Sequence, residues 1–166
     1  MNDAISRPSL QRQSDRERGQ LAWKNIEEVL QQSDDIKKKY RTQVRQFTSL
    51  VRTNGLAQTL AFLYAKGDWT EKDERKLSPE AQAVRLILVH LDAAIVKKED
   101  QLPKPDRLLK HLLHSSSQVH REATVAALAF ARWLSRFAEA ELPSEDEPSG
   151  ATAEAQEENH GSTSPS

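Results

Sequence analysis

The chain has 166 residues, with 24 lysines and arginines against 25 aspartates and glutamates, so its formal net charge is −1. It contains no cysteine, which excludes disulfide bonds and cysteine-based zinc sites. No apolar run approaches the roughly 18 residues of a membrane-spanning helix, so we expect a soluble, cytoplasmic protein.

The two ends of the chain differ in composition from its middle. Residues 143–166 contain six acidic residues but no lysine, arginine, leucine, isoleucine, valine or aromatic residue. Such a segment buries too little apolar surface to offset its ordering entropy, so we predict a disordered acidic tail there and a flexible arm at residues 1–13. In residues 1–142, 24 basic residues face 19 acidic ones, a net charge of +5 that permits polyanion binding.

Apolar residues recur at helical spacing through residues 14–142, and no strand-like alternation occurs. The pattern Ser14-Asp15-Arg16-Glu17 is typical of a capping box and predicts a helix over about 15–32. Ser33 is the expected cap of a second helix, which ends at Asn54 because Gly55 suits a positive-φ position.

A third helix, residues 56–66, is apolar on most of its surface, which is typical of a buried helix. We expect Gly55 to form a tight corner before it and Leu56, Leu60, Phe62 and Leu63 to fill the core. Its polar residues, Gln58 and Thr59, are candidates for hydrogen bonds to another helix or to a second copy of the chain.

A charged linker, residues 67–77, precedes three further predicted helices at about 78–98, 105–114 and 118–142. Ser78-Pro79 has the composition of a helix start, with a cap followed by proline at the first helical position. The chain is therefore predicted to be all-α: one compact bundle of about six helices over residues 14–142, followed by the acidic tail.

Two basic stripes are the main candidate binding features. At 100° per residue, Lys38, Arg41, Arg45 and Arg52 fall within roughly 60° on the second helix, away from its apolar stripe. Arg121, Arg132 and Arg136 form a similar stripe on the last helix. Arginine suits phosphate because its guanidinium binds an oxyanion through two parallel N–H bonds. The alternative is that both stripes are ordinary solvated helix faces.

No other pattern predicts an active site or a cofactor. His111, His114 and His120 lack a carboxylate or cysteine at metal-ligand spacing, so we expect no metal. Phosphate-binding loops and nucleophile elbows are absent from the sequence. The three tryptophans are either stacking residues for bases or packing residues, and Trp69 in the charged linker is the one we expect to touch a partner.

Two separated segments resemble a known family. "NGLAQTLAFLYAK" (residues 54–66) and "AALAFARWLSRFAEAEL" (residues 126–142) resemble signatures of the small helical subunit of the type III-B CRISPR effector, the Cmr complex. "RERGQLAW" and "YRTQVRQFTSLVRTNGL" match the layout of the same family, and the resemblance covers residues 15–142. We assign Asn54, Gly55, Leu56, Gln58, Thr59, Phe62, Trp133 and Phe137 to this motif.

The resemblance implies a non-catalytic subunit that stacks in several copies beside the backbone and large subunits and helps hold the guide RNA–target RNA duplex. Cleavage would be performed by other subunits. Phosphate contacts suffice where base pairing reads the sequence. The expected RNA-binding residues are Lys38, Arg41, Arg45, Arg52, Arg132 and Arg136, with Lys24 and Lys66 as weaker candidates.

Two alternatives stay open. The first alternative is that the chain is a stand-alone helical nucleic-acid-binding or adaptor protein. The acidic tail is either a solubility tail or a segment that covers a basic stripe until RNA binds; the sequence favours the solubility tail.

Overall fold

The computed structural model describes residues 10–96 and 100–146, with side chains from residue 14 onward. It contains six α-helices: α1 (Leu10–Leu30), α2 (Asp34–Asn54), α3 (Leu56–Ala65), α4 (Pro79–Ile95), α5 (Arg107–Leu113) and α6 (Ser117–Glu141). One 3-10 turn, η1 (Glu74–Lys76), lies between α3 and α4, and the described part of the chain contains no strand. The all-α prediction is confirmed. Residues 1–9 of the predicted arm (residues 1–13) and residues 147–166 of the predicted tail lie outside the described residues, whereas residues 10–13 belong to α1.

The helix starts follow local sequence signals, with one exception. Ser33, Ser78 and Ser116 cap α2, α4 and α6, each accepting a backbone N–H from three residues ahead. The capping-box prediction for α1 was wrong, because α1 begins at Leu10 and places Ser14 inside the helix. Residues 10–13 include no glycine or proline, and extending an existing helix through such residues is far easier than starting a new one.

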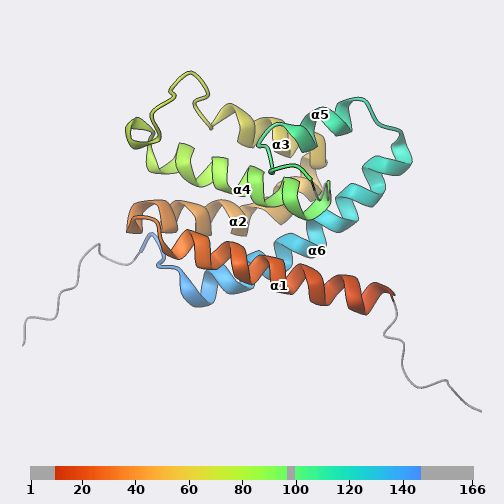
Figure 1. Ribbon diagram of the computed structural model, residues 1–166, viewed down its shortest axis with the longest axis horizontal. Helices are drawn as coiled ribbons and strands as arrows, with labels where there is room; N and C mark the ends of the chain where they lie inside the picture. Colours follow the sequence, from red (N-terminus) through yellow and green to blue (C-terminus); the bar gives the residue numbers. More distant parts are fainter. Residues whose placement is uncertain (1–9, 97–99, 147–166) are drawn as a thin grey trace, which may run out of the picture.

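The helices pack around one core, with α2 in contact with α1, α3, α4 and α6. Figure 1 shows α1 along the lower side of the bundle with the C-terminal part of α6 beside it, and α3 and α5 on the upper side. The predicted apolar stripes of α1, α2, α4 and α6 supply most of the buried side chains. The largest of these include Tyr40, Phe47, Phe130, Ile26, Leu60, Ile87 and Leu91.

The predicted corner at Gly55 is confirmed. Gly55 has φ 80° and ψ 162°, and its N–H donates to the Val51 carbonyl at 2.9 Å to end α2. Leu56, Leu60 and Leu63 then enter the core. Thr59 is also buried, but its hydroxyl donates to the Gly55 carbonyl at 2.8 Å and not to another helix.

The prediction that Phe62 fills the core was wrong: its side chain is 49% exposed. At 100° per residue Phe62 lies about 200° from Leu60, on the opposite side of α3. Because α3 is apolar nearly all round, composition alone did not show which side meets the bundle. Gln58, on this outer side, is exposed, as is Asn54 at the end of α2.

The segment between α3 and α4 is held to the bundle by its own contacts. Trp69 stacks on Tyr64 with ring centroids 4.6 Å apart, and its indole N–H donates to the Tyr64 carbonyl at 2.5 Å. The Arg85 guanidinium lies over the Trp69 ring, 4.6 Å from its centroid, and donates to the carbonyls of Gly67, Asp68 and Glu71. Trp69 is therefore a packing residue here, which corrects the expectation that it is the tryptophan presented to a partner.

Candidate nucleic-acid interface

The basic stripe of α2 is only partly available to a ligand. Arg45 and Arg52 are exposed, two helical turns apart on one face. Lys38 is 8% exposed, and Arg41 is partly buried, with Nη1 donating to the Leu142 carbonyl at 2.7 Å. The structure thus supports two of the four predicted α2 residues as accessible cations, named below the α2 arginine pair.

The C-terminal segment of this chain engages Arg41 and a neighbour of Lys38 on α2. Leu142 is bound by Arg41, and three residues later Glu145 pairs with Lys39, with Nζ and Oε1 2.7 Å apart. Arg41 and Lys39 lie about 60° and 100° to either side of Lys38 around α2, so this segment is held by residues that flank Lys38. The hydrogen bond that Lys39 donates to Glu145 raises the pKa of the Lys39 ammonium group. A helical projection of the sequence does not reveal these contacts, because they join residues about a hundred positions apart.

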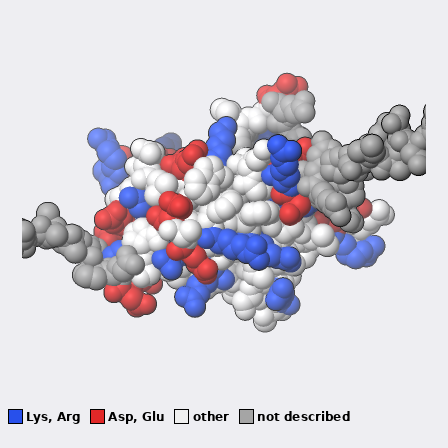
Figure 2. Space-filling view, turned by 90° about the horizontal axis from the view of Figure 1, so that it is seen from below, with Lys and Arg blue, Asp and Glu red and all other residues white. Residues whose placement is uncertain are grey.

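The predicted residues of α6 are accessible. Arg132 and Arg136 are exposed one turn apart, and we name them the α6 arginine pair. Lys24 is exposed on α1, the helix that packs most extensively against α6. Figure 2 views the face formed by these two helices and shows lysine and arginine side chains in a row across its middle, with acidic side chains close beside them.

Lys66 is engaged by neighbours on its own chain. Its Nζ lies 3.2 Å from Glu80 Oε1 and 4.5 Å from the centroid of the exposed Phe62 ring. The same Glu80 oxygen accepts a hydrogen bond from Gln43 at 3.0 Å. Lys66 would have to give up these contacts to bind a phosphate, so it is the weakest member of the predicted set.

The other two motif aromatics lie at the contact between α1 and α6. Trp133 packs against Gly19, and its indole N–H donates to Asp15 at 3.1 Å. Phe137 lies 5.1 Å from Trp23, in an edge-to-face arrangement. These contacts show that α1 and α6 run in the same direction. Sequence reasoning identified each aromatic residue separately but did not bring them together.

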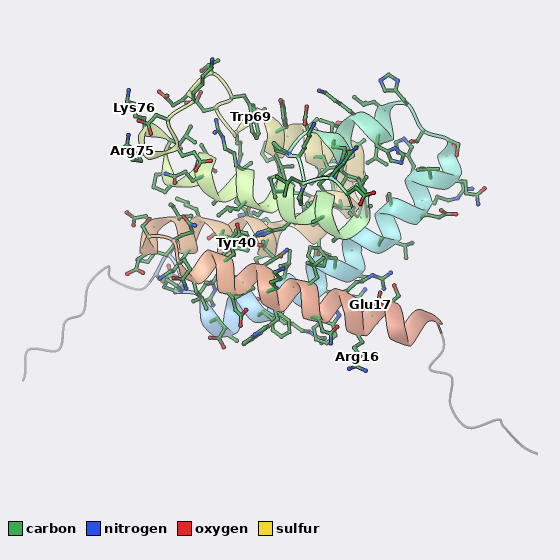
Figure 3. All side chains as sticks on the ribbon, in the orientation of Figure 1. Arg16, Glu17, Tyr40, Trp69, Arg75 and Lys76 are labelled. Atoms are coloured by element: carbon green, nitrogen blue, oxygen red, sulfur yellow. The ribbon has the colours of Figure 1, made fainter. Side chains whose placement is uncertain are left out.

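A polar network with buried Tyr40 and His90 and exposed Glu28 joins α1, α2 and α4, and sequence reasoning missed it. The Tyr40 hydroxyl lies 2.9 Å from His90 Nδ1, and His90 Nε2 lies 3.0 Å from Glu28 Oε2. The hydrogen bond to His90 lowers the pKa of Glu28, while burial raises the pKa of Tyr40. Tyr40 lies inside the bundle (Figure 3), so this network links three helices.

A second buried ion pair fixes the loop before α5. Asp92 is fully buried, and its carboxylate accepts the Lys104 backbone N–H at 2.8 Å and pairs with Arg107 at 2.6 Å. His111 and His114 line a shallow cavity of about 530 Å³ beside Arg107. Within residues 10–96 and 100–146, no group of three or more histidines and carboxylates is placed to hold a metal ion.

Two further findings concern the chain as a whole. None of the described helices has the length and apolar character needed to cross a membrane. Residues 14–141 match a family model described as CRISPR-associated protein (Cas_Cmr5). This match includes both arginine pairs, the Gly55 corner and the aromatic residues between α1 and α6.

Proposed function

The chain belongs to the Cas_Cmr5 family of CRISPR-associated proteins, and we propose that it serves a Cmr complex as a non-catalytic subunit that holds RNA. Family membership makes it a Cmr complex subunit. In our proposal, several copies stack beside the backbone and large subunits in the cytoplasm. Each copy contacts the phosphates of the guide RNA–target RNA duplex and leaves cleavage to other subunits.

The observation that carries this proposal is the exposure of two arginine pairs on rigid helices. The pairs are Arg45 with Arg52 on α2, and Arg132 with Arg136 on α6. Both helices pack on the common core, which fixes the direction in which each pair points. Exposed arginines in this arrangement suit phosphate contacts that position RNA without reading its sequence. Lys24 on α1 is a further exposed basic residue that we propose to contact RNA phosphates.

The weak charge of a single copy fits a role in an assembly. With a net charge of +5 spread over residues 1–142, one copy offers few phosphate contacts, and electrostatic affinity for RNA grows with the number of such contacts. Stacked copies add their contacts along one duplex, so the bound RNA is held far more strongly than by one copy.

The first test is assembly. The chain is co-expressed with the other Cmr subunits of the same genome and purified through a tag on a backbone subunit. We expect the measured mass of the intact assembly to correspond to several copies of the chain per complex, together with a guide RNA. A chain that purifies alone and without RNA would contradict the proposal and favour the stand-alone nucleic-acid-binding alternative.

The second test is target-RNA affinity of the assembled complex. Arg45→Glu with Arg52→Glu, and separately Arg132→Glu with Arg136→Glu, should weaken binding and reduce the slope of log affinity against log salt by about one for each phosphate that is no longer bound. Arg75→Glu with Lys76→Glu is the matched control, because these side chains are exposed and lie on the upper side of the bundle, away from α1 (Figure 3). Equal affinity of all three variants and the wild type would remove the arginine pairs from the RNA interface.

A further inference from the structure

A half-exposed cluster of aromatic rings lies between α1 and the C-terminal part of α6. It consists of Trp23, Trp133 and Phe137, which we name the aromatic seam. Trp23 and Phe137 meet edge to face at 5.1 Å, and Trp133 lies 5.5 Å from Phe137. Trp23 is 42% exposed, although a tryptophan in a small bundle gains most stability by burial.

The rings of the seam are fixed in place by contacts at their edges. The Trp23 indole N–H donates to Glu27 at 2.9 Å, and the Trp133 indole N–H donates to Asp15 at 3.1 Å. An added Cβ on Gly19 would lie 3.3 Å from the Trp133 ring, so that ring already rests on the α1 backbone. A fixed, exposed ring loses little conformational entropy when a flat partner stacks on it.

The Trp69 ring is an example, within this chain, of a tryptophan whose contacts are made by packing alone. Its ring is stacked on Tyr64, lies under the Arg85 guanidinium, and has its N–H bonded to a backbone carbonyl. The Trp23 ring meets Phe137 at an edge instead of lying under a stacked neighbour, and it stays 42% exposed. Among the tryptophans, Trp23 is therefore the one with ring surface left for an external group.

Exposed arginine side chains lie on both helices that form the aromatic seam. Arg16, Gln20 and Trp23 follow one another at spacings of four and three residues and share one face of α1. Arg16 is exposed and points away from the bundle on the lower side (Figure 3). On α6 the arginine pair alternates with the seam, since Arg132 directly precedes Trp133 and Arg136 directly precedes Phe137. Exposed guanidinium groups are thus available from both helices that hold the rings.

We propose that the aromatic seam stacks on an unpaired base of single-stranded RNA while Arg16, Arg132 and Arg136 contact its phosphates. This inference rests on the RNA contact proposed above and adds a base contact to it. Aromatic rings interleaved with basic side chains form stacking platforms for single strands, and every base offers a flat face. The large exposed side chains beside the seam, Arg16, Gln20, Arg132 and Arg136, are charged or polar. The exposed aliphatic residues Leu102 and Leu113 lie in other segments, and Val125 lies about two turns before Trp133 on α6, so an apolar protein partner fits this surface less well.

The test observes the indole N–H signals of the three tryptophans in the full-length chain by NMR at low salt. The probes are hexa-adenylate and an abasic ribose-phosphate hexamer of the same charge. We expect hexa-adenylate to shift the Trp23 signal upfield by ring stacking and the abasic hexamer to leave it unchanged. The Trp69 signal is the internal reference, because its ring is covered by its own chain. Trp23→Phe assigns the signal and keeps an aromatic ring in place.

A Trp23→Ala variant should bind hexa-adenylate about tenfold more weakly, and its affinity for the abasic hexamer should not change. Phe62→Ala, which removes an exposed aromatic side chain on α3, is the matched control and should bind like the wild type. Equal binding of both probes with a stationary Trp23 signal would overturn the stacking proposal and leave the phosphate contacts standing. If neither probe binds the isolated chain at low salt, the stacking proposal fails, whereas the phosphate contacts of the assembled complex are decided by the arginine variants described above. If Trp23→Ala instead no longer assembles with the other Cmr subunits, while the wild-type Trp23 signal responds to neither probe, the seam is a protein interface.

Discussion

Replacement of Gly55 tests the corner between α2 and α3 most directly. Its φ of 80° with ψ of 162° lies in a region that is essentially restricted to glycine. A Cβ built at this position meets no other atom within 4 Å, so a substitution adds no steric contact with the rest of the protein. Any loss of stability in Gly55→Ala therefore reports backbone strain alone.

Strain of this kind costs on the order of 1–3 kcal/mol. With an unfolding entropy of about 2.1 cal/mol/K per residue and roughly 130 folded residues, 1 kcal/mol corresponds to about 4 °C in Tm. We therefore expect Gly55→Ala to lower Tm by about 4 to 11 °C. Gly55→Val should lower it further, because a β-branched side chain resists positive φ more strongly.

The assay is urea unfolding followed by circular dichroism, together with a thermal scan. The slope of unfolding free energy against urea should stay constant, because the same surface is exposed on unfolding. Thr53→Ala, at an exposed position two residues earlier in α2, is the control and should stay within about 0.5 kcal/mol of the wild type. An unchanged Tm in Gly55→Ala would show that the corner relaxes to another backbone conformation and would refute the strain argument.

Three further predictions concern the Trp69 stack, the Asp92 ion pair and the Glu28 network. In Gly67→Ala the new Cβ would lie 2.5 Å from the Trp69 ring, so we expect a change in the near-UV circular dichroism of that tryptophan; an identical spectrum would contradict the close approach of Trp69 to Gly67. Asp92→Ala leaves the partly buried Arg107 without its carboxylate partner and the Lys104 N–H without its acceptor, and should cost about 3 kcal/mol in urea unfolding, whereas a cost below about 1 kcal/mol would show that the loop rearranges. The pKa of Glu28 is lowered in the folded state, so its stabilising contribution is present above the ordinary value of 4.5 and is lost as the pH falls below it. Glu28→Gln should flatten the dependence of unfolding free energy on pH in that acid range, and a parallel pH profile would contradict it.

The helical architecture followed from the sequence because its causes are local. Apolar spacing on α2, α4 and α6, serine caps at Ser33 and Ser78, and a glycine at the corner each act within a few residues. The same local reasoning misplaced the start of α1. A capping pattern shows where a helix is able to begin, whereas the actual start depends on whether the preceding residues continue it.

The accessible part of the basic stripes was decided by the tertiary structure. Around α2, Lys38 and Arg45 belong to the same angular stripe, yet only Arg45 is exposed. Arg41 of the same stripe is engaged by the Leu142 carbonyl, and the neighbouring Lys39 pairs with Glu145. Contacts between residues about a hundred positions apart leave no periodic signal in the sequence.

The sequence by itself determined that this chain forms helices, which of their stripes are apolar, and, through two motif segments, to which family it belongs. Only the tertiary structure decided that Phe62 faces outward, that Trp69 is covered, and that Trp23, Trp133 and Phe137 meet between α1 and α6. The physical reason is that periodicity records which side of a helix is apolar. Which neighbour covers that side, and which side chains remain at its edge, depends on how all the helices pack together.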